Sequence, residues 1–99
     1  MTLLYLEDCP SWRQAAALVR EVLAESGRPG TALRLELVRT REDAERLGFV
    51  GSPTLLVDGV DPFRTEPAEV ALACRLYRTE EGLRGLPSRA QIERALAQP

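Results

Sequence analysis

The segment TLLYLEDCPSW, residues 2–12, joins an apolar run to an amphipathic stretch and carries a cysteine, Cys9, at the junction. The apolar residues 2–6 predict a short buried strand, and Ser11 with Gln14 matches the capping box that begins many helices. A cysteine between a strand and a helix N-terminus faces free backbone N–H groups and the positive end of the helix dipole. Both favour the thiolate, the reactive form of cysteine. Cys9 is therefore the first candidate for a catalytic residue.

The residues after Cys9 predict a parallel β-α-β unit. Apolar positions at helical spacing predict a helix over residues 11–26. The alternation in Ala32–Val38 predicts a half-buried strand. Thr40 is a favourable N-cap for a short helix that Gly48 would end. A strand, a helix and a strand joined in this way predict two parallel strands with a right-handed crossover.

The second half of the chain predicts a hairpin and a final helix. Thr54–Val57 is a candidate buried strand, and the proline-containing stretch Val60–Pro67 predicts an irregular excursion. The pattern in Glu69–Tyr77 fits either a helix or a strand. We expect a strand near Cys74–Arg78, because Thr54–Val57 otherwise lacks a hairpin partner. A second capping box precedes a predicted helix over 89–97. The result is one α/β domain over residues 1–99 with about four strands.

Composition excludes several classes of function. A net charge of −2 and a pI near 5.2 argue against broad binding to nucleic acid or to an anionic membrane. No apolar run is long enough for a membrane span, and we expect Met1 to begin a mature cytoplasmic protein. The chain has no histidine, so it has neither a Cys-His catalytic pair nor an imidazole metal ligand. Two cysteines alone cannot complete a zinc site, and we expect neither metal nor cofactor.

Two motifs lie at the expected places on these elements. Cys9-Pro10-Ser11-Trp12 follows the first strand, and Gly51-Ser52-Pro53-Thr54 precedes the third. With this order of elements, the whole chain resembles the thioredoxin-like superfamily, in particular small bacterial proteins with C-P-x-W, G-S-P-T and C-R-x-Y segments. The resemblance implies that Cys9 is the first cysteine of a C-x-x-C motif. It also implies a cis-proline at Pro53, beside which an extended thiol substrate can pair. Trp12, however, occupies the position of the second, resolving cysteine.

The resemblance implies a thiol redox protein in which Cys9 attacks a disulfide and either a small thiol such as glutathione or Cys74 resolves the intermediate. Glu7 and Asp8 oppose the Cys9 thiolate, whereas Arg13 favours it. Cys9 could also be a small buried apolar residue, and Cys74 could serve core packing. The substrate-contacting candidates are Pro10, Trp12, Arg13, Ser52, Pro53 and Thr54.

Other interpretations of the sequence stay open. The protein could be a binding module without turnover, or it could bind a soft metal or a mercurial through Cys9 and Cys74. The partner could be a small thiol or a protein disulfide, and neither the reductant nor the oligomeric state follows from the sequence. We expect Arg75 and Arg78 to be solvated, with the option that either binds an anionic thiol.

Overall fold

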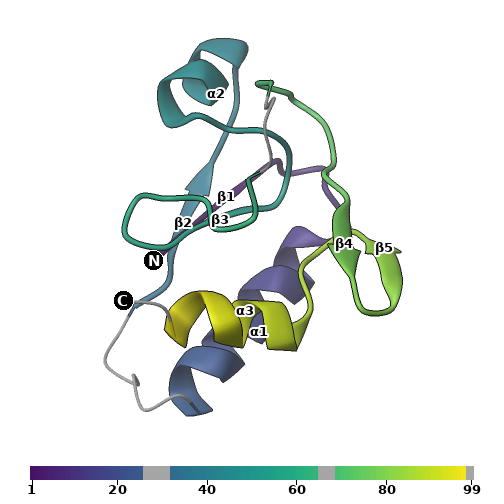
Figure 1. Cartoon of the computed structure of the whole chain (residues 1–99). Helices are drawn as coiled ribbons and strands as arrows, with labels where there is room; N and C mark the ends of the chain where they lie inside the picture. Colours follow the sequence, from purple (N-terminus) through teal and green to yellow (C-terminus); the bar gives the residue numbers. More distant parts are fainter. Residues whose placement is uncertain (26–31, 65–68, 98–99) are drawn as a thin grey trace.

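The computed structural model describes residues 1–25, 32–64 and 69–97, which form three helices and five strands in two small sheets (Figure 1). In chain order the elements are β1 (Thr2–Tyr5), α1 (Trp12–Glu25), β2 (Arg34–Leu37), α2 (Arg41–Leu47), β3 (Thr54–Leu56), β4 (Tyr77–Thr79), β5 (Gly82–Arg84) and α3 (Arg89–Ala97). The expected mixed α/β class is confirmed. The end of the first predicted helix at residue 26, and residues 65–67 of the predicted excursion, lie outside the described residues.

The larger sheet has the order β2-β1-β3, with β1 in the centre. β1 is parallel to β2, as predicted, and antiparallel to β3. Because successive side chains of a strand point to opposite faces, Leu3 and Leu4 enter different cores. Leu3 packs with residues of α1, β3 and α3, and Leu4 packs with Val38, Ala44 and Phe49. Helices α1 and α3 therefore cover one face of the sheet and α2 covers the other (Figure 1).

Local capping signals position α2 and α3. The Thr40 hydroxyl accepts a hydrogen bond from the Asp43 N–H at 3.1 Å, and Gly48 ends α2 in the left-handed conformation with φ 67°. Ser88 and Gln91 cap α3 reciprocally: the Ser88 N–H donates to Gln91 Oε1, and the Gln91 N–H donates to Ser88 Oγ. Both caps were predicted from the sequence, because a side-chain oxygen at these positions satisfies an otherwise unpaired helix N–H.

The prediction that Cys74–Arg78 pairs with β3 is wrong. β4 instead pairs with β5 in a separate two-stranded sheet, and Cys74 forms a parallel bridge with Ser52. The chain turns back on itself between Val57 and Val60 after β3 and then returns beside the residues that precede β3. A single reversal would bring the returning chain antiparallel to these residues, so the parallel bridge between Ser52 and Cys74 shows that the chain does not return as a direct hairpin.

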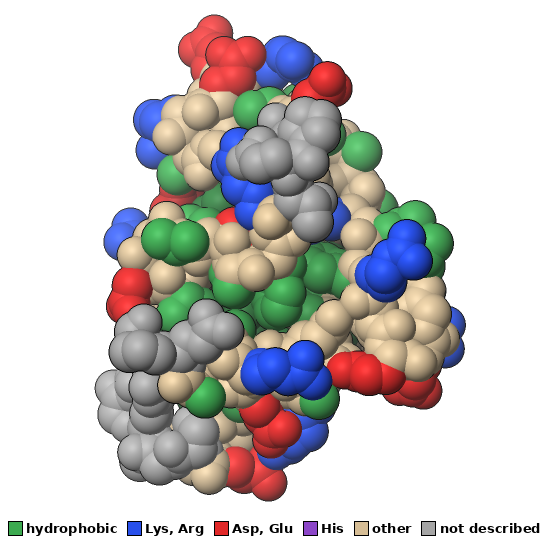
Figure 2. Space-filling model, viewed as in Figure 1, with side chains coloured by type: hydrophobic (Ala, Val, Ile, Leu, Met, Phe, Trp, Pro, Cys, Tyr) green, Lys and Arg blue, Asp and Glu red, His purple; other side chains and the backbone are tan. Residues whose placement is uncertain are grey.

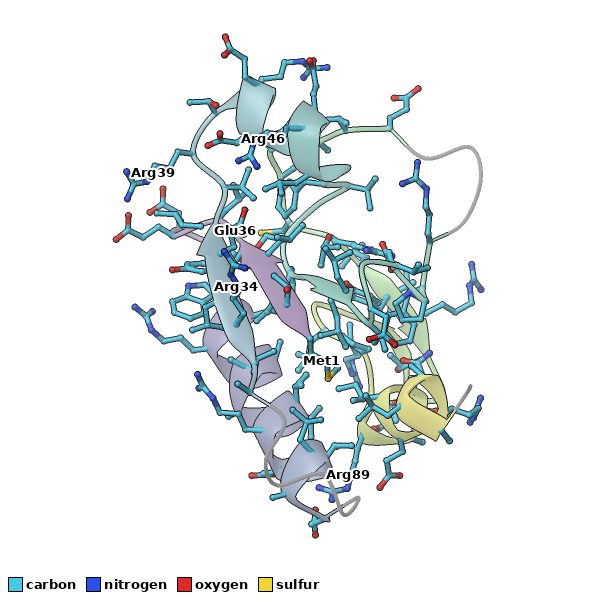
Figure 3. All side chains as sticks on the ribbon, turned by 90° about the vertical axis from the view of Figure 1, so that its left-hand side faces the viewer. Met1, Arg34, Glu36, Arg39, Arg46 and Arg89 are labelled. Carbon is cyan, nitrogen blue, oxygen red and sulfur yellow. The ribbon has the colours of Figure 1, made fainter. Side chains whose placement is uncertain are left out.

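Charged side chains protect the open edge of the larger sheet. Arg34 and Glu36 lie along the edge strand β2, with their charged groups 4.0 Å apart (Figure 3). Charges on an edge strand disfavour pairing with another chain. On another face, hydrophobic side chains gather in the middle and charged ones lie toward the rim (Figure 2). Every helix in the described part of the chain is too short or too polar to cross a lipid bilayer.

A buried ion pair holds the excursion after β3 to the rest of the domain. Arg75 Nη1 lies 2.7 Å from Asp61 Oδ2, and the two side chains are only 11% and 5% exposed. Arg75 also donates to the Phe63 carbonyl at 2.9 Å and to Thr54 Oγ1 at 3.4 Å. Its guanidinium lies over the Tyr77 ring, 4.5 Å from the centroid. The expectation that Arg75 is solvated is therefore wrong, because protein oxygens replace its water.

We predict that Arg75→Met destabilises the domain by about 3–5 kcal/mol, because it leaves the Asp61 carboxylate buried without a partner. Urea unfolding measures the loss. Arg46→Met is the matched control: Arg46 pairs with Asp43 at 3.5 Å but its side chain is 64% exposed, so the loss should be below about 1 kcal/mol. Equal losses in the two variants would contradict a structural role for the buried pair.

Candidate functional site

Cys9 lies in the turn between β1 and α1, as the sequence predicted. Its N–H donates to the Leu6 carbonyl at 3.1 Å, and the Ala15 N–H donates to the Ser11 carbonyl at 3.0 Å at the start of α1. The side chain of Cys9 is only 4% exposed. Its thiol donates to the main-chain oxygen of Ser52 at 3.6 Å. Cys9 is thus placed at the N-terminal end of a helix and against the loop that precedes β3.

Ser52 connects three segments of the chain at this point. Its N–H donates to the Ala73 carbonyl at 2.8 Å, and its carbonyl accepts from the Arg75 N–H at 2.8 Å. Its hydroxyl accepts from the Leu6 N–H at 3.0 Å. Ser52 is completely buried. The end of β1, the thiol of Cys9 and the segment that carries Cys74 are therefore fixed to one residue.

Cys9 and Cys74 line the same pocket, although 64 residues separate them in the sequence. The pocket has a volume of about 590 Å³. Its lining consists of Leu6, Glu7, Asp8, Cys9, Leu37, Val38, Arg39, Leu72, Ala73 and Cys74. Both cysteines are free thiols, Cys9 buried and Cys74 exposed. The fold thus brings together the two sulfurs that the sequence left far apart.

The two thiols interact with each other. Desolvation, the negative charge of an ionised Cys9, and a hydrogen bond with Cys9 each raise the pKa of the Cys74 thiol above its ordinary value. Each of these three causes favours the protonated form of Cys74. Two free thiols in one pocket are suited to stepwise exchange with a disulfide.

Three charged residues lie on the pocket, two acidic and one basic. Glu7 and Asp8 follow β1, and Arg39 follows β2. The Arg39 side chain extends away from the sheet (Figure 3). Arg39 was not among the site residues predicted from the sequence. The parallel pairing of β1 and β2 could have indicated it, because the carboxyl ends of parallel strands meet at one edge of a sheet. Among the described residues, no group of three or more potential metal ligands forms.

The predicted contact residues of the 52–54 loop are buried beside the site. The Ser52–Pro53 peptide bond is cis, as the motif predicted. The Thr54 hydroxyl donates to the Gly51 carbonyl at 2.6 Å, and the Tyr77 hydroxyl donates to the Pro53 carbonyl. Burial raises the pKa of Tyr77 well above its usual range, so this phenol stays protonated as a donor. These groups hold the loop in place through contacts within the chain.

The predicted contact residues near the start of α1 lie outside the pocket lining. The Trp12 ring stacks on Tyr5 with a centroid distance of 4.1 Å, and the Arg13 guanidinium lies 4.6 Å from the Trp12 centroid. Pro10 is exposed. Trp12 thus covers the end of β1, and the position of a second C-x-x-C cysteine is taken by an aromatic stack.

Gly51 allows the loop and the Cys74 segment to approach closely. Its φ is +126°, a value that side-chain-bearing residues rarely adopt. A Cβ atom at Gly51 would lie 2.8 Å from Arg75 Cβ. The absence of a side chain at this position is therefore a condition for the pairing between Ser52 and Arg75.

We predict that Gly51→Ala destabilises the domain by about 2–4 kcal/mol, the sum of backbone strain and a clash with Arg75. Gly59→Ala is the control. Gly59 has φ +80° but nothing lies within 4 Å of the added Cβ, so it should cost only about 1 kcal/mol. Thermal unfolding of both variants tests the difference, and a Gly51→Ala loss no larger than that of Gly59→Ala would refute the close approach.

Comparisons of the chain with protein-family models, with curated proteins and with solved structures give no match.

Proposed function

We propose that this protein is a thiol–disulfide oxidoreductase of thioredoxin-like architecture, with Cys9 as the nucleophile and Cys74 as the resolving thiol. The observation that carries the proposal is that both thiols line one pocket and interact there. A cytoplasmic location, where cysteines are kept reduced, fits this role. Without a C-x-x-C cysteine at position 12, the resolving thiol comes from a distant part of the chain.

Three features support the thioredoxin-like part of the proposal. The sheet order is β2-β1-β3 with β1 parallel to β2 and antiparallel to β3. Helices α1 and α3 share one face of this sheet, opposite α2 (Figure 1). The cis bond before Pro53 lies next to the residue whose carbonyl contacts the Cys9 thiol. The separate β4–β5 hairpin is the main departure from the expected four-stranded sheet.

The chemistry is a two-step exchange. The Cys9 thiolate attacks one sulfur of a substrate disulfide, so that a mixed disulfide forms and the other substrate sulfur leaves as a thiolate, which takes up a proton. Cys74 then loses its proton and attacks the Cys9 sulfur. A Cys9–Cys74 disulfide forms and the second substrate thiol is released. Two electrons pass from the protein dithiol to the substrate.

We predict that Cys74→Ser stops the reaction at the mixed disulfide. After exposure to a small disulfide, mass spectrometry should find one substrate adduct on Cys9 of the variant. The wild type should instead lose two hydrogens without an adduct. Cys74 is exposed, so the substitution should change the stability by less than about 0.5 kcal/mol.

The companion variant Cys9→Ser distinguishes nucleophilic catalysis by Cys9 from a binding role without turnover. It should form no internal disulfide and should lose the disulfide-reducing activity. Full activity of Cys9→Ser would exclude Cys9 as the nucleophile. Completion of the cycle by Cys74→Ser without added thiol would exclude Cys74 as the resolving group.

We also predict that Cys9→Ala lowers the pKa of Cys74. The charge and the hydrogen bond from Cys9 disappear, but desolvation remains, so the pKa should fall toward an ordinary thiol value without reaching it. The pH dependence of Cys74 alkylation measures this change. In the wild type, the raised pKa means that the alkylation of Cys74 accelerates as the pH rises through it. The wild type and Cys9→Ala share the pocket charges of Glu7, Asp8 and Arg39, so these charges cannot cause a difference between them. An unchanged pH profile of Cys74 alkylation would contradict an effect of Cys9 on the pKa of Cys74.

A further inference from the structure

The backbone beside Cys9 is already paired with a segment of the same chain. Residues 71–75, here called the strap, run parallel to the loop before β3. The Ala71 N–H donates to the Phe49 carbonyl at 3.3 Å, and both main-chain groups of Ser52 bond to the strap at 2.8 Å. A backbone N–H and C=O that are already hydrogen-bonded cannot also pair with a second strand. An extended polypeptide therefore cannot pair at Ser52 while the strap is in place.

The strap also forms one wall of the route to Cys9. Leu72, Ala73 and Cys74 stand on one side of the pocket, and the ends of β1 and β2 form the other. Cys9 is only 4% exposed, so a disulfide must enter this pocket to reach its sulfur. A volume of about 590 Å³ is in the range of small-molecule sites. We expect a disulfide that is flanked by polypeptide on both sides to enter the pocket poorly, because the strap occupies the backbone groups beside Cys9.

The charges on the pocket select further among small molecules. Glu7 and Asp8 outnumber Arg39 there, and the reaction adds negative charge as thiolates form. A negatively charged disulfide is repelled by the two carboxylates and by the thiolates that form. An amine-bearing disulfide is attracted by the carboxylates. Screening by salt reduces this selection but does not invert it.

We propose that the substrate is a low-molecular-weight disulfide, neutral or amine-bearing, that enters the pocket between the strap and the ends of β1 and β2. This inference rests on the proposed function. With cystamine as the example, the Cys9 thiolate attacks one sulfur and aminoethanethiolate leaves and takes up a proton. Cys74 then attacks Cys9, releases the second aminoethanethiol and closes the internal disulfide. Two equivalents of a small thiol reduce the protein again by the reverse exchange.

The test compares four disulfides on the wild-type protein. Cystamine is cationic, hydroxyethyl disulfide is neutral, dithiodipropionate is anionic, and a disulfide-linked pair of short unstructured peptides represents a polypeptide substrate. The rate of Cys9–Cys74 disulfide formation is followed by mass spectrometry. Each rate constant is divided by that of free mercaptoethanol with the same disulfide, which removes differences in intrinsic reactivity.

The normalised rate for the peptide disulfide should be roughly a hundredfold below that for hydroxyethyl disulfide, since the strap's backbone bonds must open first. Cystamine should exceed dithiodipropionate by about fivefold or more at low salt. The double variant Glu7→Gln/Asp8→Asn should remove most of this preference. The control Glu80→Gln/Glu81→Gln, which neutralises exposed acids outside the pocket lining, should retain it.

The outcomes separate the inference from the function on which it rests. If none of the four disulfides oxidises the protein through Cys9, the proposed function fails. If the peptide disulfide reacts as fast as hydroxyethyl disulfide after normalisation, the function stands and the substrate class is overturned. A preference for dithiodipropionate over cystamine would overturn the charge selection.

Discussion

The arrangement of the candidate site depends on the four hydrogen bonds of Ser52. Its amide and hydroxyl bond to Ala73 and Leu6, and its carbonyl accepts from both Arg75 and the Cys9 thiol. Each bond joins Ser52 to a part of the chain that is distant in sequence. Because a buried polar group without a partner is costly, displacement of any one segment penalises the others. The separation between the two cysteines is therefore set by the polar groups of one buried residue.

The ion pair between Arg75 and Asp61 also supports this arrangement, because it joins the strap to the excursion after β3. Arg75 contributes its backbone N–H to Ser52 and its side chain to Asp61 and the Phe63 carbonyl. One residue thus fastens the strap both to the loop before β3 and to the excursion after it. A salt bridge at this depth adds little net stability compared with apolar packing. We expect its effect to be specificity of position, because a displaced strap would leave the Asp61 carboxylate buried without its partner.

Local signals predicted the surroundings of Cys9 better than those of Cys74. The turn around Cys9 and the caps at Thr40 and Ser88 depend on residues a few positions apart, and the sequence displays them directly. The position of the strap depends instead on residues that are distant in sequence. Arg75 meets Asp61 only after the chain has turned back at Val57–Val60. The alternation around Cys74 was visible, but it could not reveal whether the partner was β3 or the loop before it. Alternate residues of the strap do pair as in a strand, at Ala71, Ala73 and Arg75. Their partner, however, is the loop before β3, and the pairing is parallel instead of the antiparallel pairing of a hairpin.

The absence of histidine from the chain gives the interaction between the two thiols a second role. In thiol exchange the attacking group of each step is a thiolate, so the resolving thiol must lose its proton before it attacks. In many cysteine enzymes an imidazole accepts the proton of the attacking thiol. In the proposed mechanism, desolvation and the charge and hydrogen bond of Cys9 raise the pKa of Cys74, which favours a protonated Cys74 until the first step is complete. Formation of the mixed disulfide removes the Cys9 charge and with it one cause of the raised pKa. In the proposed mechanism, Cys74 then becomes easier to ionise at the stage when it attacks, and this change favours the proposed order of the two steps.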